Sequence, residues 1–361
     1  MIKDKRPVWI ANRNNPISRN YGALAINSNG DFKILDRGLT HILLKANQGA
    51  SRRVAVLTDT GNFVLQELNS DGSVRDKKLW QSFDYPTDTL LIGMKLGYNF
   101  KTGKNWSLTS WVSDEFPAAG PFTLGIDPSG TSQLILWIRE DIQWRSGIWS
   151  NGKFPNLKDY LFKFDYVSND EEKYFTLSAE NAWDIDFSMY HIYREGAILH
   201  YDTSTSDRLE YSQYSRSRSN THNSLTTVVD CREARNYKSY PGCVKQQLPE
   251  CRNESWFESS RGYVLSEGTM YEKRNQILGV ADCEVRCLSN CSCVAYAFIY
   301  PNRTGCELWT NITQRKEFTF VVVAYNSNSY LSAAPGSIMD RLSPEKGTAQ
   351  YSTMFSPDRL C

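Results

Sequence analysis

The sequence contains 361 residues, which is long enough for two or three domains that each bury their own core. Its 41 basic and 40 acidic residues leave a formal net charge of +1 at pH 7. This balance argues against a nucleic-acid partner, because binding to nucleic acid depends on neutralising many phosphates.

The first 215 residues repeat one pattern: apolar and polar residues alternate, a polar turn that contains glycine follows, and the alternation resumes. The pattern occurs over residues 23–35, 54–65 and 122–137. Alternation around such a turn predicts β-hairpins, because Gly, Asn and Asp tolerate a positive φ. Shorter alternating segments at 173–178 and 186–193 predict further strands. Repeated hairpins predict a closed or prism-like all-β fold.

The chain changes character after these repeats. Residues 201–224 are rich in Ser, Thr, Arg and Asn and are predicted to form a linker. Beyond them, residues 281–290 predict a helix with Asp282 as its cap. Cys283 and Cys287 are one turn apart on this helix, so they are expected to share one of its faces.

The segment after the predicted helix is expected to be extended. Cys291 and Cys293 are two residues apart there, which predicts that they share one face of a strand. A helix face and a strand face that each carry two thiols indicate a small stapled α+β unit. From about Ser337 the sequence lacks periodicity and predicts a disordered tail.

All nine cysteines lie beyond residue 230. Together with N-glycosylation sequons they predict an oxidising compartment, in which disulfides persist. Zinc is the alternative, but structural zinc sites favour Cys-x2-Cys pairs or Cys with His, and the cluster between Cys283 and Cys293 has neither. We therefore predict disulfides and no metal site. The sequons begin at Asn105, Asn253, Asn290, Asn302 and Asn311.

Neither a secretory signal nor a membrane span is recognisable. The first 15 residues contain no apolar segment of the kind that a signal peptide needs. The longest apolar run, at 320–325, is far shorter than the roughly 20 residues of a membrane-spanning helix. The start of the chain is therefore interpreted as truncated.

Catalytic patterns are weak. The histidines lie away from any nucleophile motif such as Gly-x-Ser-x-Gly and are predicted to be surface residues. They are His41, His191, His200 and His222. The glycines of segment 97–105 are separated by five residues where a phosphate-binding loop needs four, so the segment is interpreted as a basic turn. We predict neither an enzyme nor a cofactor.

Four tryptophans stand in conspicuous motifs, namely Trp80, Trp111, Trp144 and Trp149. Large amphipathic rings of this kind are expected to fill the ends of β-sheets and to donate an N–H outward. The alternative is an aromatic platform for a ligand.

Several ordered motifs carry a family resemblance. They are WQSFDYPTDTLL at 80–91, GMKLG at 93–97, LTSW at 108–111 and WRSGIW at 144–149. These motifs resemble the S-domain of plant receptor-like kinases, the G-type lectin S-receptor-like and S-locus glycoprotein family. The segment VWIANRNNPIS at 8–18 resembles its bulb-type lectin domain, and 283–309 is similar to its PAN/apple module.

The resemblance implies a mainly β chain, with β-prism-like lectin repeats followed by a small disulfide-stapled α+β PAN/apple domain. Only the later part of a lectin domain is expected, and the EGF-like block of the family is reduced to a remnant around Cys231 and Cys243. The expected divisions are 1–92 for the partial lectin domain, 93–215 for the S-locus glycoprotein domain, 216–250 for the linker with that remnant, 251–333 for the PAN/apple domain and 334–361 for the tail.

Bulb-type lectins bind mannose through Gln-x-Asp-x-Asn-x-Val-x-Tyr, whose alternate residues share one face of a strand. Two degenerate copies are the expected carbohydrate-binding positions. The first comprises Asn27, Asn29 and Asp31, and the second comprises Thr58, Thr60, Asn62 and Val64. Only Asn62 and Val64 match the motif, so loss of mannose binding is expected. The alternative is that both copies are hairpin framework.

The resemblance to PAN modules also implies disulfide pairs that tie the helix to the sheet, Cys283 with Cys306 and Cys287 with Cys293. Cys251 with Cys291 and Cys231 with Cys243 are the further expected pairs, and Cys361 is left over.

The resemblance implies a non-catalytic recognition protein, extracellular or on the outer face of the plasma membrane. It would bind a protein, peptide or glycan in pollen recognition or defence signalling, and the resemblance also implies a homodimer. Kinase activity is not carried over, because the Gly-rich loop, Lys and Asp of phosphoryl transfer are absent. The alternative is a truncated paralogue or soluble decoy.

Overall fold

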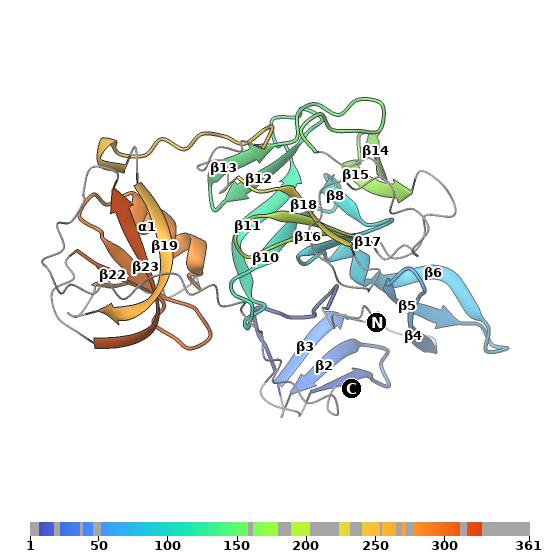
Figure 1. Cartoon of the computed structure of the whole chain (residues 1–361). Coiled ribbons are helices and arrows are strands. Elements are labelled where there is room, and N and C mark those ends of the chain that lie inside the picture. The colour runs from blue at the N-terminus through green and yellow to red at the C-terminus, as the bar shows by residue number, and fades with distance from the viewer. Residues whose placement is uncertain are drawn as a thin grey trace, which may run out of the picture.

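The structure is a computed structural model that describes residues 7–17, 22–36, 39–45, 52–157, 162–179, 189–202, 224–231, 240–252, 255–264, 269–271, 277–310 and 316–326. The described residues form antiparallel sheets and one α-helix, which confirms the predicted mainly β fold (Figure 1). Some predictions fall outside the described residues, namely those on His222, Asn253, Asn311, Cys361 and the tail 334–361.

The N-terminal part contains two three-stranded sheets, shown in blue in Figure 1. Their strands are β1 (Ala23–Ile26), β2 (Phe32–Asp36) and β3 (Leu39–Leu44) in one sheet, and β4 (Arg53–Leu57), β5 (Phe63–Leu68) and β6 (Val74–Gln81) in the other. The hairpins predicted over 23–35 and 54–65 are confirmed as β1–β2 and β4–β5. Their shared core is small and consists of Phe32, Leu65 and Trp80.

Both hairpins close with the same turn. In the first, the Asn27 N–H donates to the Asp31 carbonyl at 3.0 Å, and the Gly30 N–H donates to the Asn27 carbonyl at 2.8 Å. In the second, Thr58, Asn62 and Gly61 make the equivalent bonds at 2.9 Å each. The glycines have φ of 84° and 82°, a region that favours glycine because it carries no Cβ. The Gly-containing turns therefore set the hairpin register.

Three four-stranded sheets form the central part and share one hydrophobic core. Their orders are β10-β11-β12-β13, β14-β15-β8-β9 and β18-β17-β16-β7. The strands are β7 (Thr89–Leu91), β8 (Lys95–Asn99), β9 (Lys104–Trp106), β10 (Leu108–Trp111), β11 (Ala119–Ile126), β12 (Leu134–Ile138), β13 (Asp141–Arg145), β14 (Phe162–Ser168), β15 (Glu172–Ala179), β16 (Met189–Ile192), β17 (Ile198–Asp202) and β18 (Ser224–Val229).

The range assigned to the linker contributes to this central part. Its residues Ser224–Val229 form β18, which pairs with β17. Cys231 and Cys243 are joined by a disulfide, and both pack against the central core. The Trp144 indole, which is fully buried, donates to the Pro241 carbonyl at 2.9 Å. The segment around this disulfide is thus attached to the central part by main-chain and side-chain contacts.

The conspicuous tryptophans mainly fill cores. Trp80 and Trp144 are buried, at 5% and 0% exposed, and Trp149 is half-buried against the central core. The Trp149 indole donates to the Phe164 carbonyl at 2.7 Å. The expectation that these rings fill space is met at Trp80 and Trp144, but the indoles of Trp144 and Trp149 donate to backbone carbonyls inside the protein and not outward. Trp111 is half-buried, and its indole N–H has no hydrogen-bond partner among the described residues.

Asp127 organises the turn between β11 and β12, so its ionisation affects stability. Its carboxylate accepts from the Ser129 N–H at 2.8 Å, from the Gln133 amide at 2.7 Å and from the Thr131 hydroxyl. Burial alone would raise the pKa of Asp127, but these hydrogen bonds outweigh it and lower the pKa to about 2.

A carboxylate with a depressed pKa stabilises the fold only while it is ionised. We expect the contribution of Asp127 to be complete above about pH 4 and to be lost as the pH falls through about 2. The loss should reach about 2 kcal/mol of unfolding free energy. Urea unfolding at pH 5, 3 and 2 measures it. The variant Asp127→Asn should lose this part of the pH dependence, and an unchanged profile would contradict the assignment.

The C-terminal part, orange in Figure 1, is a five-stranded sheet with the helix α1 (Val280–Leu288). Its strands in sheet order are β19 (Ser255–Val264), β23 (Lys316–Asn326), β21 (Ala295–Ala297), β22 (Cys306–Trp309) and β20 (Thr269–Tyr271). Disulfides join Cys283 to Cys306, Cys287 to Cys293 and Cys251 to Cys291. These are the pairs that the resemblance implies, and two of them lie inside the small core.

Two local predictions in this part were wrong. Asp282 does not occupy the N-cap, which is Gly279; instead it lies in the first turn and accepts from the Gly279 N–H at 2.9 Å. Cys291 and Cys293 do not share a strand face, because β21 begins only at Ala295. A turn precedes that strand, and it directs the two thiols toward different partners.

An ion pair connects the C-terminal part to the central part. Arg139 donates to both carboxylate oxygens of Asp282, from Nε to Oδ1 at 2.7 Å and from Nη2 to Oδ2 at 2.7 Å. Nearby, the Ser113 hydroxyl donates to the Asn302 carbonyl at 2.6 Å. Asp282 is only 7% exposed. A bidentate, largely desolvated pair of this kind fixes orientation as well as distance.

Candidate functional site

The first degenerate sugar motif forms a turn rather than a strand face. Asn27, Asn29 and Asp31 precede β2, which begins at Phe32. The Asn27 amide donates to the Asp31 carboxylate at 3.0 Å, and the Asp31 N–H donates to the Asn27 side chain at 2.7 Å. Asn29 is exposed. Two of the three groups therefore hold the hairpin together.

The second motif is divided between a turn and a strand. The Thr58 hydroxyl contacts the Thr60 hydroxyl at 2.9 Å and donates to the Asn62 carbonyl at 2.9 Å. Val64 lies in β5 and is 1% exposed. Since β5 begins only at Phe63, the polar members cannot alternate along one strand. The two motifs lie in different sheets, β1-β2-β3 and β4-β5-β6.

Part of the second motif nevertheless reaches a cleft. Thr60 and Asn62 line a cleft of about 300 Å³, together with residues from β6, from the short helix η2 (Ser82–Asp84) and from β8. The other polar residues of its lining are Lys78, Gln81, Asp84 and Lys95. Phe83, Ile92 and Gly93 complete it. The cleft thus lies between the N-terminal sheet β4-β5-β6 and the central part.

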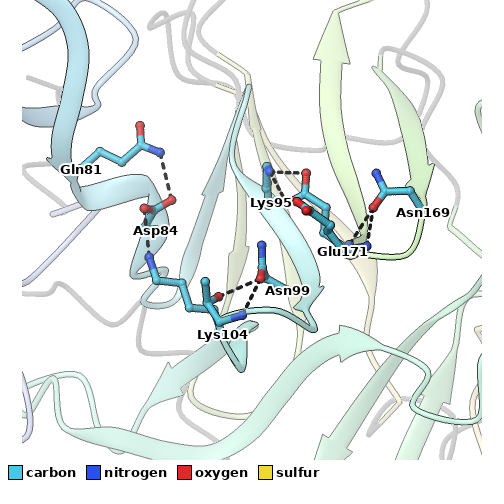
Figure 2. A network of polar contacts seen from close by, with 9 residues as sticks. Gln81, Asp84, Lys95, Asn99, Lys104, Asn169 and Glu171 are labelled. Atoms are coloured by element: carbon cyan, nitrogen blue, oxygen red, sulfur yellow. Dashed lines mark hydrogen bonds and ion pairs between the residues drawn. The ribbon is translucent and has the colours of Figure 1, made fainter.

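A chain of hydrogen bonds runs along the N-terminal wall of the cleft. The Asn62 amide donates to the Gln81 side-chain carbonyl at 3.0 Å, and the Gln81 amide donates to Asp84 at 2.9 Å. Lys104 donates to the second oxygen of Asp84 at 3.1 Å, as Figure 2 shows. Asn62 is 4% exposed, and its Oδ1 also accepts from the Ser82 hydroxyl at 3.3 Å. The wall is therefore pre-organised.

The opposite wall is held by Lys95. Its ammonium donates to both oxygens of Glu172, at 3.1 and 2.9 Å. It also lies 4.0 Å from the centre of the Tyr174 ring and 4.9 Å from that of Trp106, distances at which a cation is attracted to the ring face. The neighbouring turn is ordered by Asn99, which accepts from Thr102 (Figure 2). Lys95 thus has a fixed position at the cleft.

The sequence interpretation missed Gln81, Asp84 and Lys95. Gln81 and Asp84 belong to the motif at 80–91, and Lys95 belongs to the motif at 93–97. These motifs were used only for the resemblance. The motif at 80–91 also contains Ser82, Thr87, Asp88 and Thr89, so polarity alone does not single out Gln81 and Asp84.

The prediction of surface histidines was wrong for two of them. His191 and His200 are 4% and 5% exposed, because β16 and β17 lie inside the central core. His191 Nδ1 lies 3.1 Å from the Asp88 carboxylate and 3.2 Å from the Thr89 hydroxyl. Burial raises the pKa of Asp88, while the charge of Arg13 opposes the rise. No exposed nucleophile accompanies His191 among these contacts.

Three of the expected sequons lie among the described residues. Asn105 and Asn290 are exposed, and Asn302 is half-buried. Asn105 lies in β9 next to Lys104 and Trp106, whose side chains face the opposite side of the strand. A glycan on Asn105 would therefore point away from the cleft.

The described ranges contain neither a metal-binding cluster nor a helix that could span a membrane. There, no group of three or more His, Cys, Asp and Glu side chains is placed to hold a metal ion. The helical residues in those ranges include no stretch long and apolar enough to cross a bilayer.

Comparison with known proteins shows to which families the sequence of this chain is similar. Residues 7–112 match the family model of the D-mannose binding lectin, and residues 251–312 match that of the PAN-like domain. The chain is 38% identical over 324 residues to the G-type lectin S-receptor-like serine/threonine-protein kinase CES101 of Arabidopsis thaliana, an alignment that covers 84% of this chain and 38% of that protein.

A second relative aligns over most of its own length. The S-locus-specific glycoprotein S6 of Brassica oleracea is 31% identical over 345 residues, which covers 86% of this chain and 76% of the glycoprotein. Against the receptor-like kinases the chain spans well under half of the relative, 38% and 35% for two from Arabidopsis thaliana. The chain belongs to the family of G-type lectin S-receptor-like kinases and S-locus glycoproteins.

Proposed function

We propose that this chain is a non-catalytic recognition module that acts outside the cell and binds a ligand in the cleft between β4-β5-β6 and the central part. The observation that carries the proposal is the convergence of Asn62, Gln81, Asp84 and Lys95 on that cleft. Ligand sites are typically concave, with a few fixed polar groups among apolar walls. The lectin and glycoprotein names of the relatives support this role.

Mannose is not the proposed ligand. Thr58 and Thr60 stand where the mannose motif has Gln and Asp, and both hydroxyls are engaged within the turn. A site built to hydrogen-bond a sugar hydroxyl loses much of its selectivity when those groups are replaced. Pollen recognition and defence signalling remain the proposed settings by family, with a homodimer as the proposed assembly. A soluble decoy would bind the same ligand in the same cleft. The proposed binding therefore applies both to a receptor-type recognition module and to a decoy.

Gln81 is the side chain that tests this function, because it links Asn62 to Asp84. We expect the secreted wild-type chain to bind a subset of an array of plant cell-wall glycans and to leave mannose unbound. Gln81→Leu should weaken that binding at least tenfold, about 1.4 kcal/mol. The control Gln66→Leu changes a glutamine on β5 outside the cleft lining and should bind as wild type. Binding to mannose alone, or equal binding by both variants, would contradict the proposal.

A further inference from the structure

We infer that the cleft selects a saccharide that carries a carboxylate, a uronic-acid type of sugar. The inference rests on the proposed function and names its ligand class. It follows from the charges of the cleft, from its unused hydrogen-bond donors and from its size.

The lining carries more positive than negative charge. Lys78 and Lys95 contribute two ammonium groups, and Asp84 contributes the one carboxylate. Lys95 is paired with Glu172, so Lys78 carries the positive charge that no carboxylate of the described residues balances. Both oxygens of Asp84 are already occupied, one by Gln81 and one by Lys104. The carboxylate therefore has its charge balanced by Lys104 and about half of its acceptor sites used.

Donors remain available on the same wall. Within the described part of the chain, no hydrogen bond or ion pair engages the ammonium of Lys78, which is exposed at the cleft. The Gln81 amide uses one N–H to bind Asp84 and has a second, and Gln81 is only half-buried at the cleft. A surplus of donors beside an ammonium group favours a ligand rich in acceptors that bears a negative charge.

The apolar residues and the size of the cleft favour a sugar over a peptide. Phe83 and Ile92 supply an apolar wall for the C–H face of a sugar ring. A volume of about 300 Å³ is at the lower end for small-molecule sites, enough for a short saccharide. Peptide recognition commonly uses an open sheet edge or a long groove. Although β6 is an edge strand of its sheet, a cleft of about 300 Å³ is small for an extended peptide. A uronate combines ring, hydroxyls and carboxylate in this space.

Titration of the full chain with digalacturonic acid tests the inference, with the neutral galactose disaccharide as the matched probe. We expect saturable binding of the acidic disaccharide that weakens with added salt, and binding of the neutral one at least tenfold weaker. Lys78→Gln should weaken binding of the acidic probe about tenfold, whereas Lys78→Arg should retain it. The control Lys77→Gln changes the adjacent exposed lysine, which does not line the cleft, and should bind as wild type.

The outcomes separate this inference from the proposed function. Equal binding of both disaccharides, lost in Gln81→Leu, would overturn the acidic ligand while supporting a recognition cleft. Equal weakening by Lys77→Gln and Lys78→Gln would show an unspecific charge effect and would overturn the inference. Tighter binding of an acidic peptide of the same charge would overturn the saccharide assignment. Thermal melting of each variant checks that it is folded, and Lys78→Arg keeps the charge test valid if Lys78→Gln is unstable.

Discussion

Replacement of Asp282 by alanine should lower the free energy of unfolding by about 3 kcal/mol, because it leaves a partly buried guanidinium without its carboxylate. Asp282 has two roles that are lost together. It accepts two bonds from Arg139 across the contact between the central and C-terminal parts, and it accepts the Gly279 N–H at the start of α1. Loss of a helix-terminal acceptor by itself costs about 1 kcal/mol.

The two roles can be separated by a double-mutant cycle. Arg139→Met removes the ion pair but leaves the helix terminus intact, so it should cost less than Asp282→Ala. The coupling energy between the two positions should exceed about 1.5 kcal/mol. Urea unfolding of the whole chain, with tryptophan fluorescence and circular dichroism as separate probes, measures the cycle. We expect the Asp282→Ala transitions to separate, because the C-terminal part then unfolds without the central part.

An exposed ion pair provides the matched control. Arg75 and Glu67 lie 3.1 Å apart, but their side chains are 52% and 23% exposed. Their cycle should give a coupling of less than about 1 kcal/mol, since solvent screens such pairs. Equal couplings at the two sites would show that burial does not strengthen the Arg139–Asp282 contact.

The second large effect is expected at Arg252, which is 6% exposed in the C-terminal part. Its guanidinium donates to the carbonyls of Cys287, Asn290 and Cys293, at and beyond the C-terminal end of α1. Burial lowers the pKa of Arg252, and its charge is stabilised by these carbonyls and by the helix end. Arg252→Met should cost about 3 kcal/mol, because it leaves buried acceptors without a donor.

The neighbouring disulfide keeps the chain connection the same in the variant and in the wild type. Cys251 and Cys291 remain covalently joined in the variant, so a loss of stability reports the hydrogen bonds and not the chain connection. The measurement is urea unfolding under non-reducing conditions, together with hydrogen exchange of the α1 amides. Lys245→Met, an exposed cation in the segment before Arg252, should change stability by less than about 0.5 kcal/mol. A similarly small loss in Arg252→Met would refute the role of its guanidinium.

The N-terminal hairpins and the helix could be predicted from the sequence, because each depends on a pattern of residues within one short segment. Alternation around Gly30 and Gly61 predicted both N-terminal hairpins, since a glycine with positive φ suits a tight turn. The helix was expected over 281–290 and extends over Val280–Leu288. Its cap was misassigned, because an acidic residue in the first turn serves the helix end as well as one at the N-cap does.

The candidate site was only partly accessible from sequence. Asn62 was found because it matches a motif, whereas Gln81 and Lys95 come from other segments and meet it only in the folded chain. The burial of His191 and His200 also depends on packing, because β16 lies between β7 and β17 and contributes to the central core. A histidine among apolar residues in β16 and β17 predicts a strand with one solvated face, which packing on both faces overrides.

The sequence alone determined the mainly β class, the family resemblance and the concentration of cysteines beyond residue 230. Composition and motifs can be read directly from the sequence. The β class follows from short-range order, because turn residues and strand alternation encode it locally. Only the tertiary structure decided that β18 completes a central sheet, that Arg139 holds Asp282, and that Lys78 and Lys95 face one cleft. Each of these depends on residues far apart in the chain, which only packing and the pairing of charges bring together.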